Sequence, residues 1–332
     1  MRLHSLRHAR ISGTGSYLPE KRLTNPELER MVDTNHDWIV QRTGIHERRI
    51  AAPHEATSDL AAAAARKAIE SAGLQPADID MVIVATVTPD MAFPATACLV
   101  QHSLGCRLVP AFDLAAACSG FLYGMMIGRT AIAAGTANHV LLIGAEVLSR
   151  FTDYTDRNTC ILFGDGAGAV VLSAVEGGEP GIIDAHCAAD GSGAELMTMP
   201  GGGSRRPVTP ENVNDRNQFI HLEGRAVYKQ AVGHIIRLVD ESLTRCGLSR
   251  RDVDLIIPHQ MNARIIESAA AKLAIPMEKI YVNIDRYGNT SGATIPIAID
   301  EARRDGRLRP GNLAVLVAFG GGMTWGSALI RW

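Results

Sequence analysis

The stretch Asp113-Leu-Ala-Ala-Ala-Cys118-Ser-Gly-Phe-Leu-Tyr-Gly124 decides how this chain folds, because a buried-looking strand gives way there to an apolar helix with a cysteine at the turn. That helix is apolar on nearly every face, and such a helix belongs in the middle of a molecule. A thiol on the first turn of a helix lies near unpaired N–H groups and the positive end of the helix dipole, which stabilise a thiolate. We therefore predict that Cys118 is a nucleophile at the centre of the fold, with a small core-filling cysteine as the alternative.

Two other segments favour the nucleophile. His259 follows a predicted strand over residues 254–258, and Asn289 lies in the loop Arg286-Tyr-Gly-Asn289-Thr-Ser-Gly292. Cysteine, histidine and asparagine together form a set used in nucleophilic catalysis. A cysteine hydrolase has these residues in the same chain order, but its local signature around the nucleophile is absent from this sequence.

The sequence also contains an internal repeat. Residues 71–83 line up with residues 245–257 at an offset of 174, and each segment reads as the end of a helix, a short loop and a strand. Two further matches have offsets of 172 and 156: Asp113, Ser119 and Gly120 with Asp285, Ser291 and Gly292, and residues 163–166 with residues 319–322. Ordered matches near half the chain length indicate a duplicated unit. We predict two halves, residues 1–174 with the nucleophile and residues 175–332 with the histidine and the asparagine.

The predicted elements make the chain an α/β protein. Apolar, β-branched runs alternate with Ala-rich helical stretches such as residues 60–72. Two duplicated sheets that flank a buried central helix pair predict a five-layer αβαβα sandwich. Residues 200–216 combine glycine, proline and charge without periodicity, and they read as a surface loop.

Composition excludes several classes of protein. The 332 residues are 46% hydrophobic and 20% charged with a net charge of -2, so the chain can bury a large core and has no overall basic field for nucleic acid. The six cysteines show no pairing pattern, which argues against a metal site or a disulfide framework and fits a reducing cytosol. The N-terminus has no apolar signal core, and the longest apolar run, residues 114–128, is too short to span a bilayer. We expect a cytoplasmic protein that binds neither nucleic acid nor a membrane.

Three glycine clusters have different interpretations. Residues 13–15 and 164–168 lack the pattern of a nucleotide-phosphate loop, because the first runs into a proline and the second into a strand. Gly320, Gly321 and Gly322 follow a predicted strand. Glycines in such a turn let the backbone approach a ligand and aim N–H groups at it, as an oxyanion hole requires, whereas a tight hairpin without a ligand is the alternative.

Several motifs occur in the order of a known family. They are Gly13-Thr-Gly-Ser-Tyr-Leu-Pro19, Asp37-Trp-Ile-Val-Gln-Arg-Thr-Gly44, the Cys118 turn, Phe163-Gly-Asp-Gly-Ala-Gly-Ala169, Pro258-His-Gln260, Tyr287-Gly-Asn-Thr-Ser291 and Phe319-Gly-Gly-Gly-Met-Thr-Trp-Gly326. With them the chain resembles β-ketoacyl-acyl-carrier-protein synthase III, the condensing enzyme that starts fatty-acid synthesis, within the thiolase superfamily. The resemblance implies the thiolase fold, a homodimer without a cofactor, a triad of Cys118, His259 and Asn289, and an oxyanion hole from the N–H groups of Cys118 and Gly321.

The implied reaction is a Claisen condensation in two stages. The Cys118 thiolate takes an acyl group from acyl-CoA, and malonyl-acyl-carrier protein then loses CO₂ to give the carbanion that attacks this acyl group. Neutral His259 and the amide of Asn289 are expected to donate hydrogen bonds to the enolate oxygen. Whether His259 also activates Cys118 stays open.

The motifs do not decide the primer or the pathway. Acetyl-CoA or another short acyl-CoA is the expected primer, but pocket shape discriminates acyl chains by only about 1 to 3 kcal/mol per methylene. A synthase-III-like acyltransferase or a condensing enzyme of a secondary pathway is the nearer alternative. A non-catalytic acyl-CoA-binding module is the remote one, because it would not need all three triad members.

Substrate contacts also come from the resemblance. Trp38 and Arg157 correspond to the pair that stacks on the CoA adenine, a role that suits an indole face and a guanidinium plane. The other implied positions are Arg42 and Thr43 on the same CoA-recognition segment, Gly224 and Asn262 beside the pantetheine arm, Phe93 and Phe163 around the acyl pocket, with Phe93 reaching across the dimer, and Lys229, Arg264 and Lys272 toward the carrier protein. Half-buried packing for Trp38 and a solvated surface for the three cations are the alternatives.

Overall fold

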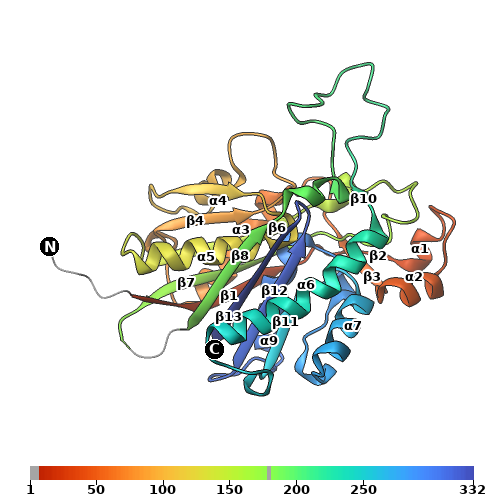
Figure 1. Cartoon of the computed structure of the whole chain (residues 1–332). Coiled ribbons are helices and arrows are strands. Elements are labelled where there is room, and N and C mark those ends of the chain that lie inside the picture. Colours follow the sequence, from red (N-terminus) through yellow and green to blue (C-terminus); the bar gives the residue numbers. More distant parts are fainter. Residues whose placement is uncertain (1–6, 178–180) are drawn as a thin grey trace.

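The computed structural model describes residues 7–177 and 181–332, in which strands and helices alternate along the chain (Figure 1). The first half contains β1 (His8–Tyr17), β2 (Lys21–Thr24), α1 (Asn25–Leu28), α2 (His36–Thr43), β3 (Glu47–Ile50), α3 (Thr57–Ser71), β4 (Met81–Ala85), α4 (Thr96–Leu104), β5 (Ala111–Leu114), the 3₁₀ turn η2 (Ala117–Ser119), α5 (Gly120–Ala133), β6 (His139–Glu146) and β7 (Gly166–Val175). The second half contains β8 (Ile182–Ala189), β9 (Met197–Thr198), β10 (His221–Leu222), α6 (Gly224–Arg245), β11 (Leu255–Pro258), α7 (Ala263–Leu273), α8 (Ile284–Tyr287), the 3₁₀ turn η7 (Ser291–Ala293), α9 (Thr294–Arg304), β12 (Leu313–Gly320) and β13 (Thr324–Arg331).

Two main sheets repeat one topology. The first has the order β1-β7-β6-β4-β5, in which β4 runs parallel to β5 and β6 while β7 runs antiparallel to β6 and β1. The second has the order β11-β12-β13-β8, in which β11 and β12 are parallel and β13 is antiparallel to both of its neighbours. Ile280 forms a parallel bridge with Ile256 of β11. It thus occupies the place in the second sheet that β5 has in the first. The predicted duplication is therefore present in the fold.

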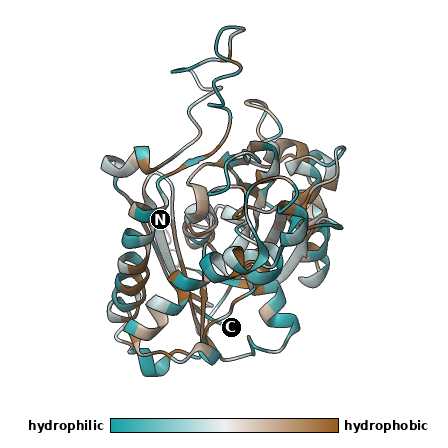
Figure 2. Ribbon diagram, turned by 90° about the vertical axis from the view of Figure 1, so that its right-hand side faces the viewer, coloured by the Kyte–Doolittle hydropathy of each residue, from teal (hydrophilic) through white to brown (hydrophobic). Residues whose placement is uncertain are grey.

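The sheets and helices form five layers, because both faces of each sheet are buried. In β4, Val82 and Val84 pack toward α3 and α4, whereas Ile83 points to the opposite face and packs with α5 and α9. The second sheet packs on α5 and α9 from the other side and is covered outside by α6 and α7. Figure 2 shows hydrophobic residues on the inner strands and hydrophilic ones on the projecting loop. The predicted five-layer αβαβα sandwich is confirmed.

The repeat differs from its sequence prediction at the nucleophile turn. The turn η2 precedes α5 as η7 precedes α9, and Ala117 and Ser291 share a left-handed backbone with φ of 45° and 46°. These positions are 174 residues apart, so the offset of 172 from matching Ser119 with Ser291 is wrong by two residues. Identity of small residues misled that alignment, since the backbone places Ser291 opposite Ala117.

The connection between the halves runs from β7, which ends at Val175, to β8, which begins at Ile182. Residues 178–180 lie outside the described residues. We propose that the halves divide within this connection, whereas the expected boundary at 174/175 falls at the last residue of β7. Residues 200–216 contain no helix or strand and belong to the loop that projects at the top of Figure 1, as predicted.

Candidate active site

Cys118 lies in η2, between β5 and the central helix α5, and is 4% exposed. The end of β12 presses against it. A Cβ atom on Gly320 would stand 2.8 Å from the Cys118 nitrogen, so only glycine allows this approach. Gly321 is the next residue, and the structure thus places the glycine turn beside the cysteine, as an oxyanion hole would require.

Burial controls the protonation of Cys118. Desolvation raises the pKa of the thiol to about 12, which outweighs the lowering by a hydrogen bond with the Ser291 side chain. The regular helix α5 starts only at Gly120, so Cys118 lies in the turn before it. Burial therefore opposes the thiolate that the helix start was expected to stabilise, and it favours the thiol in the unliganded site.

His259 directly follows β11 and is 4% exposed. Its backbone N–H donates to Val317 of β12 at 2.8 Å, and its Nδ1 lies 2.6 Å from the Thr294 hydroxyl. The other ring nitrogen, Nε2, is buried and has no hydrogen-bond partner among the described residues. Burial lowers the pKa of His259 to about 3, so the imidazole is neutral near pH 7, as expected.

Asn289 is fixed by its backbone and by its side-chain oxygen. Its N–H donates to Leu162 at 2.8 Å, and its carbonyl accepts from Gly164 at 3.1 Å. The side-chain Oδ1 accepts from the Ser291 N–H at 2.8 Å. This bond orients the amide group, and the Nδ2 donor is left for a ligand.

The three expected triad members come together around Ser291. Its side chain hydrogen-bonds with Cys118, its N–H with Asn289, and its carbonyl with the Thr294 hydroxyl that contacts His259. The turns η2 and η7, one from each half, also pack against each other. The repeat therefore brings a thiol, an imidazole and an amide to one place in the centre of the molecule.

Four of the expected CoA contacts gather around α2. The guanidinium groups of Arg42 and Arg157 lie 4.7 Å and 4.4 Å from the Trp38 ring centroid. Asn262 caps the start of α7, and its Nδ2 donates to the Arg42 carbonyl at 3.0 Å. This arrangement offers a planar, partly exposed surface flanked by cations, which suits a nucleotide base.

Two other expected contacts lie differently. Thr43 is buried, and its hydroxyl donates to the Ile39 carbonyl and accepts from the Ile45 N–H, so it is already satisfied at the end of α2. Gly224 is exposed at the first residue of α6, and a Cβ atom there would meet no atom within 4 Å. Neither position has contacts like those of the Trp38 cluster, the name used here for Trp38, Arg42, Arg157 and Asn262.

The two phenylalanines expected around the acyl pocket have opposite environments. Phe163 is buried and forms a parallel bridge with Asn289, which places it beside the triad. Phe93 is 85% exposed in the loop before α4. An aromatic side chain this exposed has no packing role within its own chain.

The cations expected to meet the carrier protein lie on two helices that pack together. Lys229 is on α6, whereas Arg264 and Lys272 are on α7, and all three are exposed. No ion pair involves them in residues 7–177 and 181–332. The three cations thus lie on helices of the outer layer, of which α7 also packs against α2 (Figure 1).

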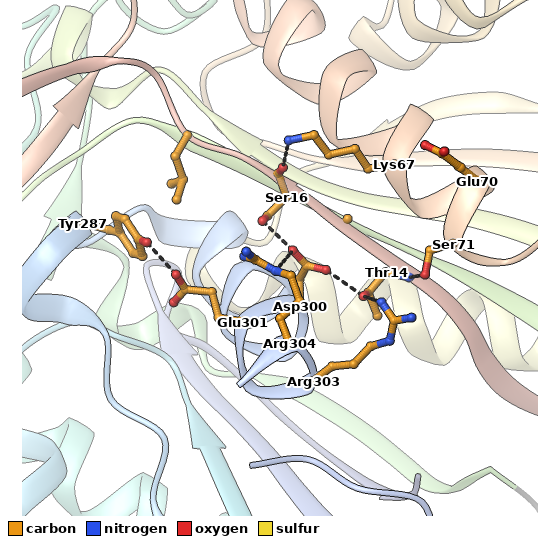
Figure 3. A pocket seen from close by; sticks show the side chains of 12 residues that line it. Thr14, Ser16, Lys67, Glu70, Ser71, Tyr287, Asp300, Glu301, Arg303 and Arg304 are labelled. Atoms are coloured by element: carbon orange, nitrogen blue, oxygen red, sulfur yellow. Dashed lines mark hydrogen bonds and ion pairs between the residues drawn. The ribbon is translucent and has the colours of Figure 1, made fainter. Parts of the chain in front are cut away.

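A large cavity lies elsewhere, between β1, α3 and α9 (Figure 3). Its volume is about 630 Å³, and its walls include none of the expected site residues among those that the structure describes. Asp300 in its wall accepts from Thr14 at 2.7 Å and from Ser16 at 2.6 Å. These bonds tie α9 to β1, so the polar groups of this cavity serve the packing of the two halves.

The structure adds three residues to the site that the sequence did not point to as functional: Ser291, Thr294 and Glu146. Only Ser291 had a signal, since the repeat matched it with a residue next to Cys118. Glu146, at the end of β6, is fully buried and hydrogen-bonds with Ser291, Thr88 and Val87. Such contacts join segments distant in sequence, and no local pattern reports them.

Comparison with known proteins agrees with this geometry. Residues 112–191 match the family model described as 3-oxoacyl-[acyl-carrier-protein (ACP)] synthase III, and residues 243–332 match its C-terminal counterpart. The β-ketoacyl-[acyl-carrier-protein] synthase III of Caldanaerobacter subterraneus subsp. tengcongensis is 52% identical over 324 residues, which are 98% of each chain. This chain belongs to the β-ketoacyl-acyl-carrier-protein synthase III family.

Solved structures of the synthase III family share the fold. The 3-oxoacyl-[acyl-carrier-protein] synthase III of Aquifex aeolicus is 45% identical and superposes with a TM-score of 0.89 over 98% of this chain and 100% of that one. A priming β-ketosynthase from the R1128 polyketide pathway is 34% identical, with a TM-score of 0.91 over 100% and 98%. The chain is thus a condensing acyltransferase of fatty-acid biosynthesis with the thiolase fold, and the hydrolase and binding-module alternatives are wrong.

None of the helices in the described ranges combines the length and hydrophobicity needed to cross a lipid bilayer. In the same ranges, no three side chains of His, Cys, Asp or Glu are grouped as a metal ion would require.

Proposed function

We propose that this synthase III family member joins an acyl-CoA primer to malonyl-acyl-carrier protein, releasing CoA and CO₂ and giving a β-ketoacyl-acyl-carrier protein. The convergence of Cys118, His259 and Asn289 around Ser291, beside the glycine turn after β12, carries this proposal. Acetyl-CoA or another short acyl-CoA is the proposed primer. No cofactor takes part, because both substrates are already activated as thioesters.

In the first stage, Cys118 Sγ attacks the thioester carbon of the primer, and the C–S bond to CoA breaks. The N–H groups of Cys118 and Gly321 would stabilise the oxyanion, and one such donor is worth about 3 kcal/mol. The thiol proton ends on the departing CoA sulfur. The product is an acyl-cysteine at the start of the central helix.

In the second stage, the malonyl group loses CO₂ and its thioester becomes an enolate. The Nδ2 group of Asn289 is a donor at any working pH, because an amide does not titrate. His259 supplies a second donor when Nε2 carries hydrogen. The carbanion then attacks the acyl-cysteine, and Cys118 leaves as a thiolate that takes up a proton.

Substrate recognition follows from the surface groups. The Trp38 cluster would stack on the CoA adenine, the pantetheine arm would pass Asn262 and Gly224 toward Cys118, and Thr43 supports this segment from within. Lys229, Arg264 and Lys272 would meet an acidic carrier protein. Exposed Phe93 supports a homodimer in which it closes the acyl pocket of the partner next to Phe163, and β5 lies at an open sheet edge that a second copy could extend.

The likeness to the polyketide priming synthase, at 34% identity, is an observation that points toward a secondary pathway. The 52% identity to a relative named β-ketoacyl-[acyl-carrier-protein] synthase III outweighs it and supports a place in fatty-acid biosynthesis. Six free cysteines fit a reducing compartment, and we propose the cytoplasm.

Mass spectrometry of the intact protein tests the proposal. The chain is mixed with equal amounts of acetyl-CoA and of longer, branched and dicarboxylic acyl-CoAs, and the adduct is weighed and mapped. We expect one short acyl group on Cys118 and none in Cys118→Ala, with Cys160→Ala as a buried-cysteine control that still labels. An adduct on Cys160 or Cys246 instead would contradict the mechanism.

A further inference from the structure

Thr294, the first residue of α9, is 3% exposed. Its hydroxyl lies within hydrogen-bond distance of two groups, the Ser291 carbonyl and the His259 ring. Its Oγ1 lies 2.9 Å from the Ser291 carbonyl and 2.6 Å from His259 Nδ1. A hydroxyl has one proton to give, and a carbonyl oxygen can only accept. The Thr294 proton therefore goes to Ser291, a bond typical of threonine in the first turn of a helix. His259 Nδ1 must then carry the hydrogen of the second bond.

We infer that Thr294 is a positioning residue that holds His259 as its Nδ1–H tautomer, so that Nε2 enters the reaction as an unprotonated acceptor. This inference rests on the proposed function and deepens it. Buried polar atoms nearly always have a hydrogen-bond partner, yet Nε2 has none in the described part of the chain. We expect Nε2 to be satisfied during the reaction, when it accepts a proton.

In the first stage, this tautomer gives the buried thiol the base that it needs. As Cys118 Sγ bonds to the thioester carbon, its proton moves to Nε2. As the bond from that carbon to the CoA sulfur breaks, the proton moves from Nε2 to the CoA sulfur. His259 ends the stage as it began, with Nδ1–H on Thr294 and Nε2 bare.

The second stage consumes one proton, because a carboxylate leaves as neutral CO₂ and Cys118 must return to a thiol. The malonyl carboxylate favours a charged imidazole next to it, so Nε2 takes up a proton from solvent when this substrate enters. Nε2–H then donates to the enolate oxygen. When the acyl group leaves Cys118, the same proton passes to Sγ. Thr294 accepts from Nδ1–H throughout and never touches the substrate.

Nitrogen NMR of the wild-type chain tests the tautomer directly. The protein is labelled with ¹⁵N-histidine, and the signal of His259 is assigned by its loss in His259→Gln. We expect an unprotonated Nε2 and a protonated Nδ1 near pH 7. A protonated Nε2 in the unliganded chain would overturn the inference, and this readout does not depend on any enzyme activity.

Three variants test the consequence for the two stages. Thr294→Val removes the hydroxyl and keeps the shape, Thr294→Ser keeps the hydroxyl, and Thr152→Val removes a buried hydroxyl that donates only to the Leu148 carbonyl at 2.9 Å. Acylation of Cys118 and release of labelled CO₂ from malonyl-acyl-carrier protein are measured separately. We expect Thr294→Val to slow both by about tenfold, the effect of one hydrogen bond, and to mix the His259 tautomers. Thr294→Ser and Thr152→Val should be close to wild type.

Equal rates for Thr294→Val and wild type, or a loss in Thr152→Val as large as in Thr294→Val, would assign Thr294 a packing role only. If the wild-type chain neither acylates Cys118 nor releases CO₂, the proposed function fails, while the NMR result still decides the tautomer.

Discussion

At the scale of single residues, burial governs the chemistry around Cys118 more than the helix dipole does. The thiol of Cys118 and the carboxyl of Glu146 both have a raised pKa, and the imidazole of His259 has a lowered pKa. In each case burial removes the group from water and destabilises its charged form. The sequence identified Cys118, His259 and Asn289 by residue type and motif. It could not give their protonation, since desolvation depends on what surrounds each group in space.

The roles of Asn289 and Cys118 can be separated by two variants. Asn289→Ala should retain acylation of Cys118 and lose about 10²- to 10³-fold in CO₂ release, because only the enolate needs the Nδ2 donor. Cys118→Ala should show the converse, with no acylation and residual CO₂ release. Both half-reactions are measured for each variant with labelled substrates. Equal losses of both half-reactions in Asn289→Ala would show that the amide maintains the shape of the site instead.

Glu146 offers a prediction about stability. Desolvation raises its pKa from the ordinary value of 4.5 to about 7, so between these values the folded chain holds a proton that the unfolded chain has released. The stability of the wild type therefore falls as pH rises through this range. Glu146→Gln cannot titrate at this position. The free energy of unfolding of the variant minus that of the wild type should therefore be larger, meaning a relatively more stable variant, at pH 8 than at pH 5.

Urea unfolding at the two pH values measures this difference. Glu20→Gln, which changes an exposed carboxyl, serves as the control and should show no such dependence. A difference between Glu146→Gln and wild type that is the same at both pH values would mean that Glu146 is already ionised at pH 5.

At the scale of elements, the turns that precede α5 and α9 carry the site, and the sequence located both of them. The continuous apolar, β-branched run of β4 and the apolar α5 were sufficient to predict a buried sheet and a central helix. The register of the repeat at η2 and η7 was wrong by two residues, because it was set by small-residue identity and the backbone conformation of Ala117 and Ser291 has no sequence signal. Gly320 was recognised as part of a turn, but its contact with Cys118 required the fold.

Helix α2 carries a prediction about substrate choice. Trp38→Ala and Arg157→Ala should weaken the use of acyl-CoA by about tenfold or more, because each removes a stacking partner of the adenine. Acyl-pantetheine lacks the adenine and should be used nearly as well as by the wild type. Values of kcat/KM for both substrates give the test, with the exposed Arg251→Ala as control. Matching losses on the two substrates would show that Trp38 and Arg157 only pack the fold.

At the scale of the whole molecule, the duplication explains why the site lies in the centre. Each half supplies one turn, and only their packing brings Cys118 of the first half to His259 and Asn289 of the second. The proposed homodimer would add exposed Phe93 of each chain to the site of the other. A second copy would bury this side chain and finish the acyl pocket.

Mixing two inactive variants tests this completion. Cys118→Ala keeps Phe93 but has no nucleophile, and Phe93→Asp keeps the nucleophile but places a charge in the pocket of its partner. After the two are unfolded and refolded together, hybrid dimers contain one pocket with both intact groups. We expect condensation activity that neither variant shows when it is refolded alone. The absence of any recovered activity, with dimers present by sedimentation, would place Phe93 in its own chain's pocket or outside both.

The buried, protonated state of Cys118 also affects how the chain withstands damage. Peroxides and alkylating reagents attack the thiolate, and a thiol that stays protonated and covered reacts slowly with them. Cys98, which is exposed, has no such protection. Oxidative stress would thus modify the surface first and leave the nucleophile intact, and an inhibitor that reacts with Cys118 would need to present its electrophile on a CoA-like body that enters the site as the primer does.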